Sequence, residues 1–135
     1  MKLSEVNPLE PLKELLLSAG LDEQIYVGKA PTANLPNSYV VLYQNGGLNS
    51  NMSKLGIIRG VVLISVNVKL LSNGQRNLTK HKVILNKFDE LFAENQSQEK
   101  DGYTYSLNLD SMVYQGGGIK EGYTTELINL NFNKQ

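Results

Sequence analysis

The single histidine of the chain, His81, is the first residue to consider for catalysis, because a Ser-His-Asp type of triad would have to use it. It stands between Lys80 and Lys82 in a segment with helical periodicity. No serine lies in a Gly-x-Ser-x-Gly motif, so no nucleophile is marked. We interpret His81 as an exposed residue on the charged flank of a helix. The sequence predicts no catalytic residue and no enzyme activity.

Metal and cofactor sites have equally little support. The chain has no cysteine, which excludes disulfides and thiolate ligands, and a single histidine cannot form a zinc cluster. Three acidic pairs lack the spacing of a calcium loop, and we interpret them as solvated surface groups. These pairs are Asp22 with Glu23, Asp89 with Glu90, and Glu99 with Asp101. The sequence predicts neither a bound metal nor a cofactor.

A glycine-rich tract, QGGGIKEG at residues 115–122, could be taken for a phosphate-binding loop. It lies between two segments with strand periodicity, lacks a Gly-Lys-Ser/Thr sequence and leads into no helix. Neither the P-loop nor the dinucleotide-binding fingerprint is therefore met. The tract is typical of a hairpin turn.

Charge and aromatic content argue against nucleic acid as a direct partner. Thirteen basic and thirteen acidic residues give a formal net charge of zero, so no electrostatic attraction to a polyanion is expected. The seven tyrosines alternate along strands without interleaved basic residues. They fit core edges or a protein interface better than base stacking. No apolar run approaches the roughly 20 residues that span a membrane.

Hydrophobic periodicity predicts the element order α, β, β, β, α, β, β. The second helix ends near Ala93 and has Ser72, Asn73 and Asn77 as competing N-caps. A polar link over Glu94–Gly102 follows it. The other predicted elements are a helix at Pro8–Ala19 and strands at Ile25–Val27, Ser38–Gln44, Ile57–Leu71, Tyr103–Tyr114 and Tyr123–Phe132.

This order predicts one α+β domain over residues 1–135, since neither a repeat nor a composition shift marks a second one. We expect a mainly antiparallel sheet of four to five strands with both helices packed on one face. Strand order stays open, because a strand followed by a helix can also form a parallel crossover.

The strand Ser38–Gln44 is apolar on both faces, so it needs cover on two sides. One face is turned toward the helices, and the other needs a second subunit or a curled sheet. Residues 45–56 are rich in glycine and small polar residues, which indicates a flexible loop. The candidate interface residues on this strand and loop are Tyr39, Val41, Tyr43, Leu48, Met52 and Leu55.

Five segments, spread over about four fifths of the chain, carry a resemblance to the tail terminator or tail-completion proteins of long-tailed bacteriophages. They are PLKELLLSAG, IYVGKAPTANLPNSYVVLY, RGVVLISVNVKL, NLTKHKVILNKFDELF and TTELINLNF. Family members typically carry the proline directly before the aromatic strand residues. Here Asn37 and Ser38 intervene between Pro36 and Tyr39.

The resemblance implies a structural protein that forms a ring, usually of six copies, at the neck of the virion. Such a ring ends tail-tube polymerisation and joins tail to head, so its partners are copies of itself, the tail-tube protein and the head-connector protein. It implies assembly in the bacterial host cytoplasm, for a phage or prophage product, and no enzyme activity. Three alternatives remain: a head-tail adaptor or stopper, a small-ligand-binding domain, and a host protein of related fold with an unrelated task.

Overall fold

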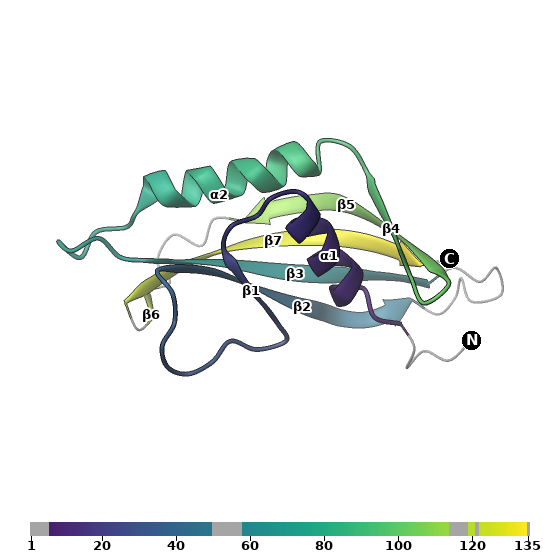
Figure 1. Cartoon of the computed structure of the whole chain (residues 1–135), viewed down its shortest axis with the longest axis horizontal. Coiled ribbons are helices and arrows are strands. Elements are labelled where there is room, and N and C mark those ends of the chain that lie inside the picture. The colour runs from purple at the N-terminus through teal and green to yellow at the C-terminus, as the bar shows by residue number, and fades with distance from the viewer. Residues whose placement is uncertain (1–5, 50–57, 114–118, 121, 135) are drawn as a thin grey trace.

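The computed structural model describes residues 6–49, 58–113, 119–120 and 122–134 (Figure 1). The chain forms an α+β fold, and both predicted helices and all five predicted strands lie close to their expected positions. The elements are α1 (Leu9–Ser18), β1 (Gln24–Val27), β2 (Ser38–Asn49), β3 (Ile58–Lys69), α2 (Leu78–Leu91), β4 (Gln96–Lys100), β5 (Tyr103–Val113), β6 (Ile119–Lys120) and β7 (Tyr123–Lys134).

The sheet is larger than predicted and mixed, so the expectation of four to five mainly antiparallel strands is wrong in number. Its strand order is β1-β2-β3-β7-β5-β4, with β6 paired to β7. The pair β1 and β2 is parallel, and the other described pairs are antiparallel. The last strand of the described chain, β7, therefore lies in the interior of the sheet between β3 and β5.

The sequence missed two strands: the two-residue β6, which lies within the tract predicted as a hairpin turn, and β4, which lies within the segment predicted as a polar link. Its sequence, QSQEK, contains no apolar residue, so hydrophobic alternation cannot reveal it. It is held by antiparallel pairing to β5, with Gln98 opposite Tyr105. A short charged strand at a sheet edge is one way in which proteins prevent pairing between edges.

A second correction concerns the predicted loop at residues 45–56. Strand β2 continues to Asn49 and pairs with β3 as far as Arg59, with a register shift between Asn45 and Asn49. Residues 45–49 are therefore strand, while residues 50–56 lie outside the described part of the chain. Glycines at strand ends are compatible with such an irregular register.

Both helices pack on one face of the sheet, as predicted, and share one apolar core with it. The inward side chains of β3 and β7 alternate as expected, and Ile64 lies opposite Ile128 in the register. The buried residues at the centre of the core are Leu12, Leu15 and Leu16 from α1, Ile84, Leu85 and Phe88 from α2, and Val62, Ile64, Val66, Ile128, Leu130 and Phe132 from the strands.

Helix α1 lies where the curled sheet, a half-barrel, brings its two edges toward each other (Figure 1). It packs against β4 at one edge and against β1 and β2 at the other. Lys100 Nζ on β4 lies 2.8 Å from Glu14 Oε1 on α1. The hydroxyl of Tyr105 accepts a hydrogen bond from the Asn7 backbone N–H at 3.1 Å. The helix thus covers the opening between the edge strands.

Among the three competing N-caps, Asn77 is the one that begins α2. Its Oδ1 accepts a hydrogen bond from the Lys80 backbone N–H at 3.1 Å. We expect Asn77→Ala to lower the free energy of unfolding by about 1 kcal/mol, because an orphan N–H loses its acceptor. In contrast, Asn86→Ala in the exposed middle of α2 should leave stability unchanged or raise it slightly. Urea unfolding of both variants checks this, and equal effects would contradict the cap.

Candidate functional site

The face of the sheet that points away from both helices, called the helix-free face below, carries the surface of interest. Odd-numbered residues of β2, β3 and β7 point to this face, because their even-numbered neighbours fill the core. The pairing registers align them in three cross-strand rows. The rows are Tyr39 with Asn67 and Thr125, Val41 with Ser65 and Leu127, and Tyr43 with Leu63 and Asn129.

Residues 28–37, called the strap below, fold back over one end of this face. Gly28 turns the chain with a φ of 83° and donates its N–H to the Leu42 carbonyl at 2.8 Å. The Tyr123 hydroxyl lies 2.7 Å from the Pro36 carbonyl oxygen and 3.3 Å from that of Leu35. Figure 1 shows the strap on the side of the sheet opposite to α2. The connection between β1 and β2 thereby becomes a cover for the helix-free face.

Three tyrosines from three strands meet beneath the strap. The ring of Tyr39 lies edge-on to that of Tyr26 at 5.8 Å and to that of Tyr123 at 5.5 Å, measured between centroids. Edge-to-face contacts of this kind add stabilisation beyond the burial of area. This end of the face is therefore a second, smaller packed layer.

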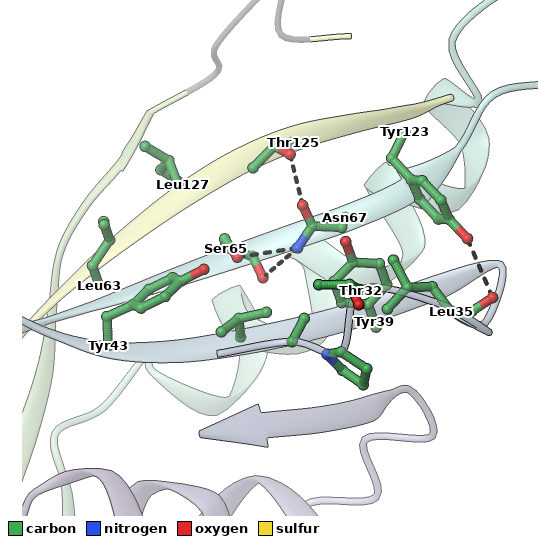
Figure 2. A pocket seen from close by; sticks show the side chains of 13 residues that line it. Thr32, Leu35, Tyr39, Tyr43, Leu63, Ser65, Asn67, Tyr123, Thr125 and Leu127 are labelled. Carbon is green, nitrogen blue, oxygen red and sulfur yellow. Dashed lines mark hydrogen bonds between the residues drawn. The ribbon is translucent and has the colours of Figure 1, made fainter. Parts of the chain in front are cut away.

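The middle of the helix-free face is polar, but its groups bond to one another. The Asn67 Nδ2 donates to Ser65 Oγ at 3.0 Å, and Thr125 Oγ1 donates to Asn67 Oδ1 at 2.6 Å (Figure 2). Ser65 and Asn67 are buried. The amide oxygen and one amide hydrogen of Asn67 are thus already engaged within the sheet.

A hollow of about 590 Å³ opens over these rows (Figure 2). Thirteen of the described residues line it, and none of the thirteen is charged. Thr32 and Leu35 of the strap lie beside Tyr39 and Tyr123, whereas Tyr43, Leu63 and Leu127 lie away from these strap residues (Figure 2). We call Tyr43, Leu63 and Leu127 the open half of the hollow. All three are partly exposed.

The structure brings three of the six predicted interface residues into this hollow. Tyr39 and Val41 are already buried within the single chain, at 9% and 2% exposure, and only Tyr43 remains partly exposed. The curled sheet and strap thus supply much of the cover that a second subunit was expected to give. Leu48 belongs to β2, but its side chain is not described, and Met52 and Leu55 lie outside the described residues.

Sequence reasoning missed the contributions of β3 and β7 to this surface. The signal was available, because Leu63 and Leu127 occupy outward positions of strands whose inward positions were assigned correctly. The packing of the strap had no comparable signal, since residues 28–37 show no hydrophobic period.

His81 is not the exposed helix residue that was predicted, because it is 2% exposed and faces the core between α2 and β7. Its Nε2 lies 2.6 Å from Thr124 Oγ1. Since the Thr124 hydroxyl donates to the Val68 carbonyl at 3.3 Å, it must accept from His81. The Nε2 atom of the imidazole therefore carries a proton. Burial, with Arg76 nearby, lowers the pKa of His81 to about 4, so the ring is neutral at pH 7.

Glu126 completes this buried cluster. Its Oε1 lies 3.0 Å from Arg76 Nη2 and 3.8 Å from His81 Nδ1. Burial raises the pKa of Glu126, while the Arg76 charge opposes that rise. The Oε2 of Glu126 and the Nδ1 of His81 have no hydrogen-bond partner among the described residues. This cluster contains an imidazole and a carboxylate held in fixed geometry.

The order of Thr124, His81 and Glu126 resembles a nucleophile, a base and an orienting acid, but access is missing. All three side chains are almost fully buried. We therefore interpret the cluster as a structural tie between α2 and β7.

Two other kinds of site also lack support. The part of the chain that is described contains no group of three or more metal-ligating side chains. Neither described helix is long and apolar enough to cross a membrane.

Comparison with known proteins adds a fold likeness. No family model matches the chain, and no curated protein matches it. Among the solved structures that match, one of a protein whose name states no function has a TM-score of 0.63 and 12% sequence identity. The match covers 93% of this chain and 89% of the other. At this identity the likeness concerns the fold alone, which this chain thus shares with a protein of similar length.

Proposed function

We propose that this chain is a structural protein that works by assembly, as a ring-forming tail terminator at the neck of a phage or prophage virion. Its partners in this proposal are copies of itself, the tail-tube protein and the head-connector protein. The observation that carries the proposal is the open half of the hollow. There, Tyr43, Leu63 and Leu127 present a partly exposed apolar surface on the helix-free face.

The edge strands of the sheet favour this surface over strand pairing as the contact. Strand β4 is short and polar, and α1 packs against both β4 and β1. A short, polar edge strand offers little for pairing between copies. Docking on the helix-free face requires no rearrangement of α1, and it buries apolar area that the single chain leaves exposed.

The internal hydrogen bonds of the hollow count against a small polar ligand. Its volume of about 590 Å³ is within the usual range for ligand sites. Its buried polar groups, however, are paired within the Thr125, Asn67 and Ser65 chain rather than aimed outward. A ligand would have to break these bonds to be recognised by them. An apolar protein contact would leave them intact.

Assembly can be tested with Leu127→Gln, which places an amide in the open half. We expect at least tenfold weaker self-association or binding to the tail-tube protein, because truncated interface anchors commonly cost more than 1 kcal/mol. Sedimentation velocity of the purified protein, alone and with the tube protein from the same genome, measures the effect. The matched control is Leu78→Gln, because Leu78 is 62% exposed on α2, away from this face.

The comparison counts only if both variants unfold at temperatures near that of the wild type. If Leu127→Gln unfolds at a much lower temperature, Leu63→Gln provides a second probe. A wild-type protein that stays monomeric and ignores the tube protein would sink the proposal. Binding to the portal side of the connector without binding to the tube would favour an adaptor or stopper.

A further inference from the structure

The strap shows what kind of segment the helix-free face accepts. Its sequence at the hollow, from Ala30 to Pro36, is APTANLP. This sequence carries no charged residue, and its second and last residues are prolines. It has no helix or strand in the structure. Two of its carbonyl oxygens, those of Leu35 and Pro36, lie within hydrogen-bond reach of the Tyr123 hydroxyl. One end of the face is thus already occupied by an irregular, proline-containing segment.

The open half offers the same combination of groups. Tyr43 points its hydroxyl toward the middle of the hollow (Figure 2), and within the described chain no hydrogen bond to this hydroxyl is found. Leu63 lies opposite Tyr43 on β3, and Leu127 lies farther off on β7, in the neighbouring cross-strand row. Grooves that bind proline-rich segments are lined by aromatic side chains, and Tyr43 supplies one such side chain here.

We propose that the open half binds an extended, uncharged, proline-containing segment of a partner protein, in the way that the strap occupies the covered half. This inference rests on the proposed function, because it names the chemistry of the partner at the same surface. The Tyr43 hydroxyl donates to a backbone carbonyl of that segment, while Leu63 and Leu127 contact its apolar side chains.

The charge and the length of the occupant follow from the hollow itself. No charged side chain is found among its thirteen described lining residues, so a charged group placed there would lose water without gaining a partner. The open half extends across three neighbouring strands, from Tyr43 on β2 to Leu127 on β7, which is two strand spacings or about 10 Å. An extended proline-rich chain covers that distance in about three residues. A segment of five to seven residues is therefore sufficient.

A capped heptapeptide with the strap sequence APTANLP is the probe. Titrated into the isotope-labelled full chain, it should shift the amide signals of Tyr43, Leu63 and Leu127 in a saturable manner. Tyr43→Phe should weaken binding about fivefold, because one hydrogen bond is lost and the ring is kept. Tyr26 does not line the hollow, so Tyr26→Phe should leave the affinity unchanged. A peptide carrying Lys for Thr and Asp for Asn should bind at least tenfold more weakly.

Three results would overturn the inference. They are the absence of saturable shifts at millimolar peptide, equal binding of the charged peptide, and shifts confined to Tyr123 and Leu35. The last result would mean that the peptide had replaced the strap instead of filling the open half. The proposed function is judged separately, because Leu127→Gln can abolish assembly even where no peptide binds. In that case the surface is a docking site for a folded partner, and only this inference fails.

Discussion

Replacing Arg76 with alanine should lower the free energy of unfolding by about 3 kcal/mol at neutral pH. The change leaves the Glu126 carboxylate, which is 3% exposed, without the guanidinium that lies 3.0 Å away. An unpaired buried charge is costly because it has lost its water. Arg76 itself is 29% exposed, so solvent screens part of the interaction, and we place the loss at the low end for buried pairs.

The effect of Arg76→Ala should depend on pH. Burial already raises the pKa of Glu126, and loss of Arg76 should raise it further. Protonation then removes the buried charge, so the stability gap between variant and wild type should shrink as the pH falls toward 4. Urea unfolding at pH 7 and pH 4 measures this gap. The control is Lys100→Ala, which breaks an ion pair with Glu14 on the surface and should cause no measurable loss. Equal effects of the two variants would contradict the assigned role of Arg76.

Acid should destabilise the folded chain through His81, by up to about 3 kcal/mol between pH 7 and pH 4. The folded pKa is about 4 and the unfolded pKa is 6.5, so the unfolded state binds the proton first as the pH falls. Stability from His81 is therefore complete above pH 6.5 and is lost between 6.5 and 4. Glu126 acts in the opposite sense, because its raised pKa favours the folded state where the carboxyl is protonated.

The variant that isolates the His81 contribution is His81→Gln. Its side-chain amide can still donate to the Thr124 hydroxyl, which accepts from Nε2 in the wild type, but it does not titrate. We expect its unfolding free energy to fall less steeply than that of the wild type between pH 6.5 and 4, as measured by urea unfolding at several pH values. Parallel pH profiles for the two proteins would show that His81 is not the group responsible.

The sequence predicts the core of this fold well, because hydrophobic periodicity reports which side of an element is buried. Ile64 and Val66 on β3 and Ile128 and Leu130 on β7 all face the helices as expected. The same reasoning could have placed His81. It lies three residues before Ile84 and four before Leu85, and therefore on the apolar stripe of α2. Its lysine neighbours misled the prediction, since adjacent residues of a helix point in different directions.

The rest of the candidate site depends on contacts that no local pattern encodes. Strand β4 exists through main-chain pairing, and its side chains give no sign of it. The strap is held by carbonyl groups of Leu35 and Pro36, and every residue type has a carbonyl. The sequence could thus predict that Tyr39 and Val41 need cover on their outer side. It could not decide between the chain itself and a second copy as the source of that cover.

The interior position of β7 constrains the order in which the fold can be built. During synthesis β7 leaves the ribosome after β1 to β6, yet it is the strand that joins β3 to β5. Until β7 is available, β1 to β3 form one group of strands and β4 with β5 form another, and the two groups are not joined in one sheet. The pairing of β3 with β7 joins residues far apart in the chain, such as Ile64 and Ile128. Such long-range closure slows folding. Before β7 pairs, the unpaired edges and apolar faces of the early strands can contact other chains.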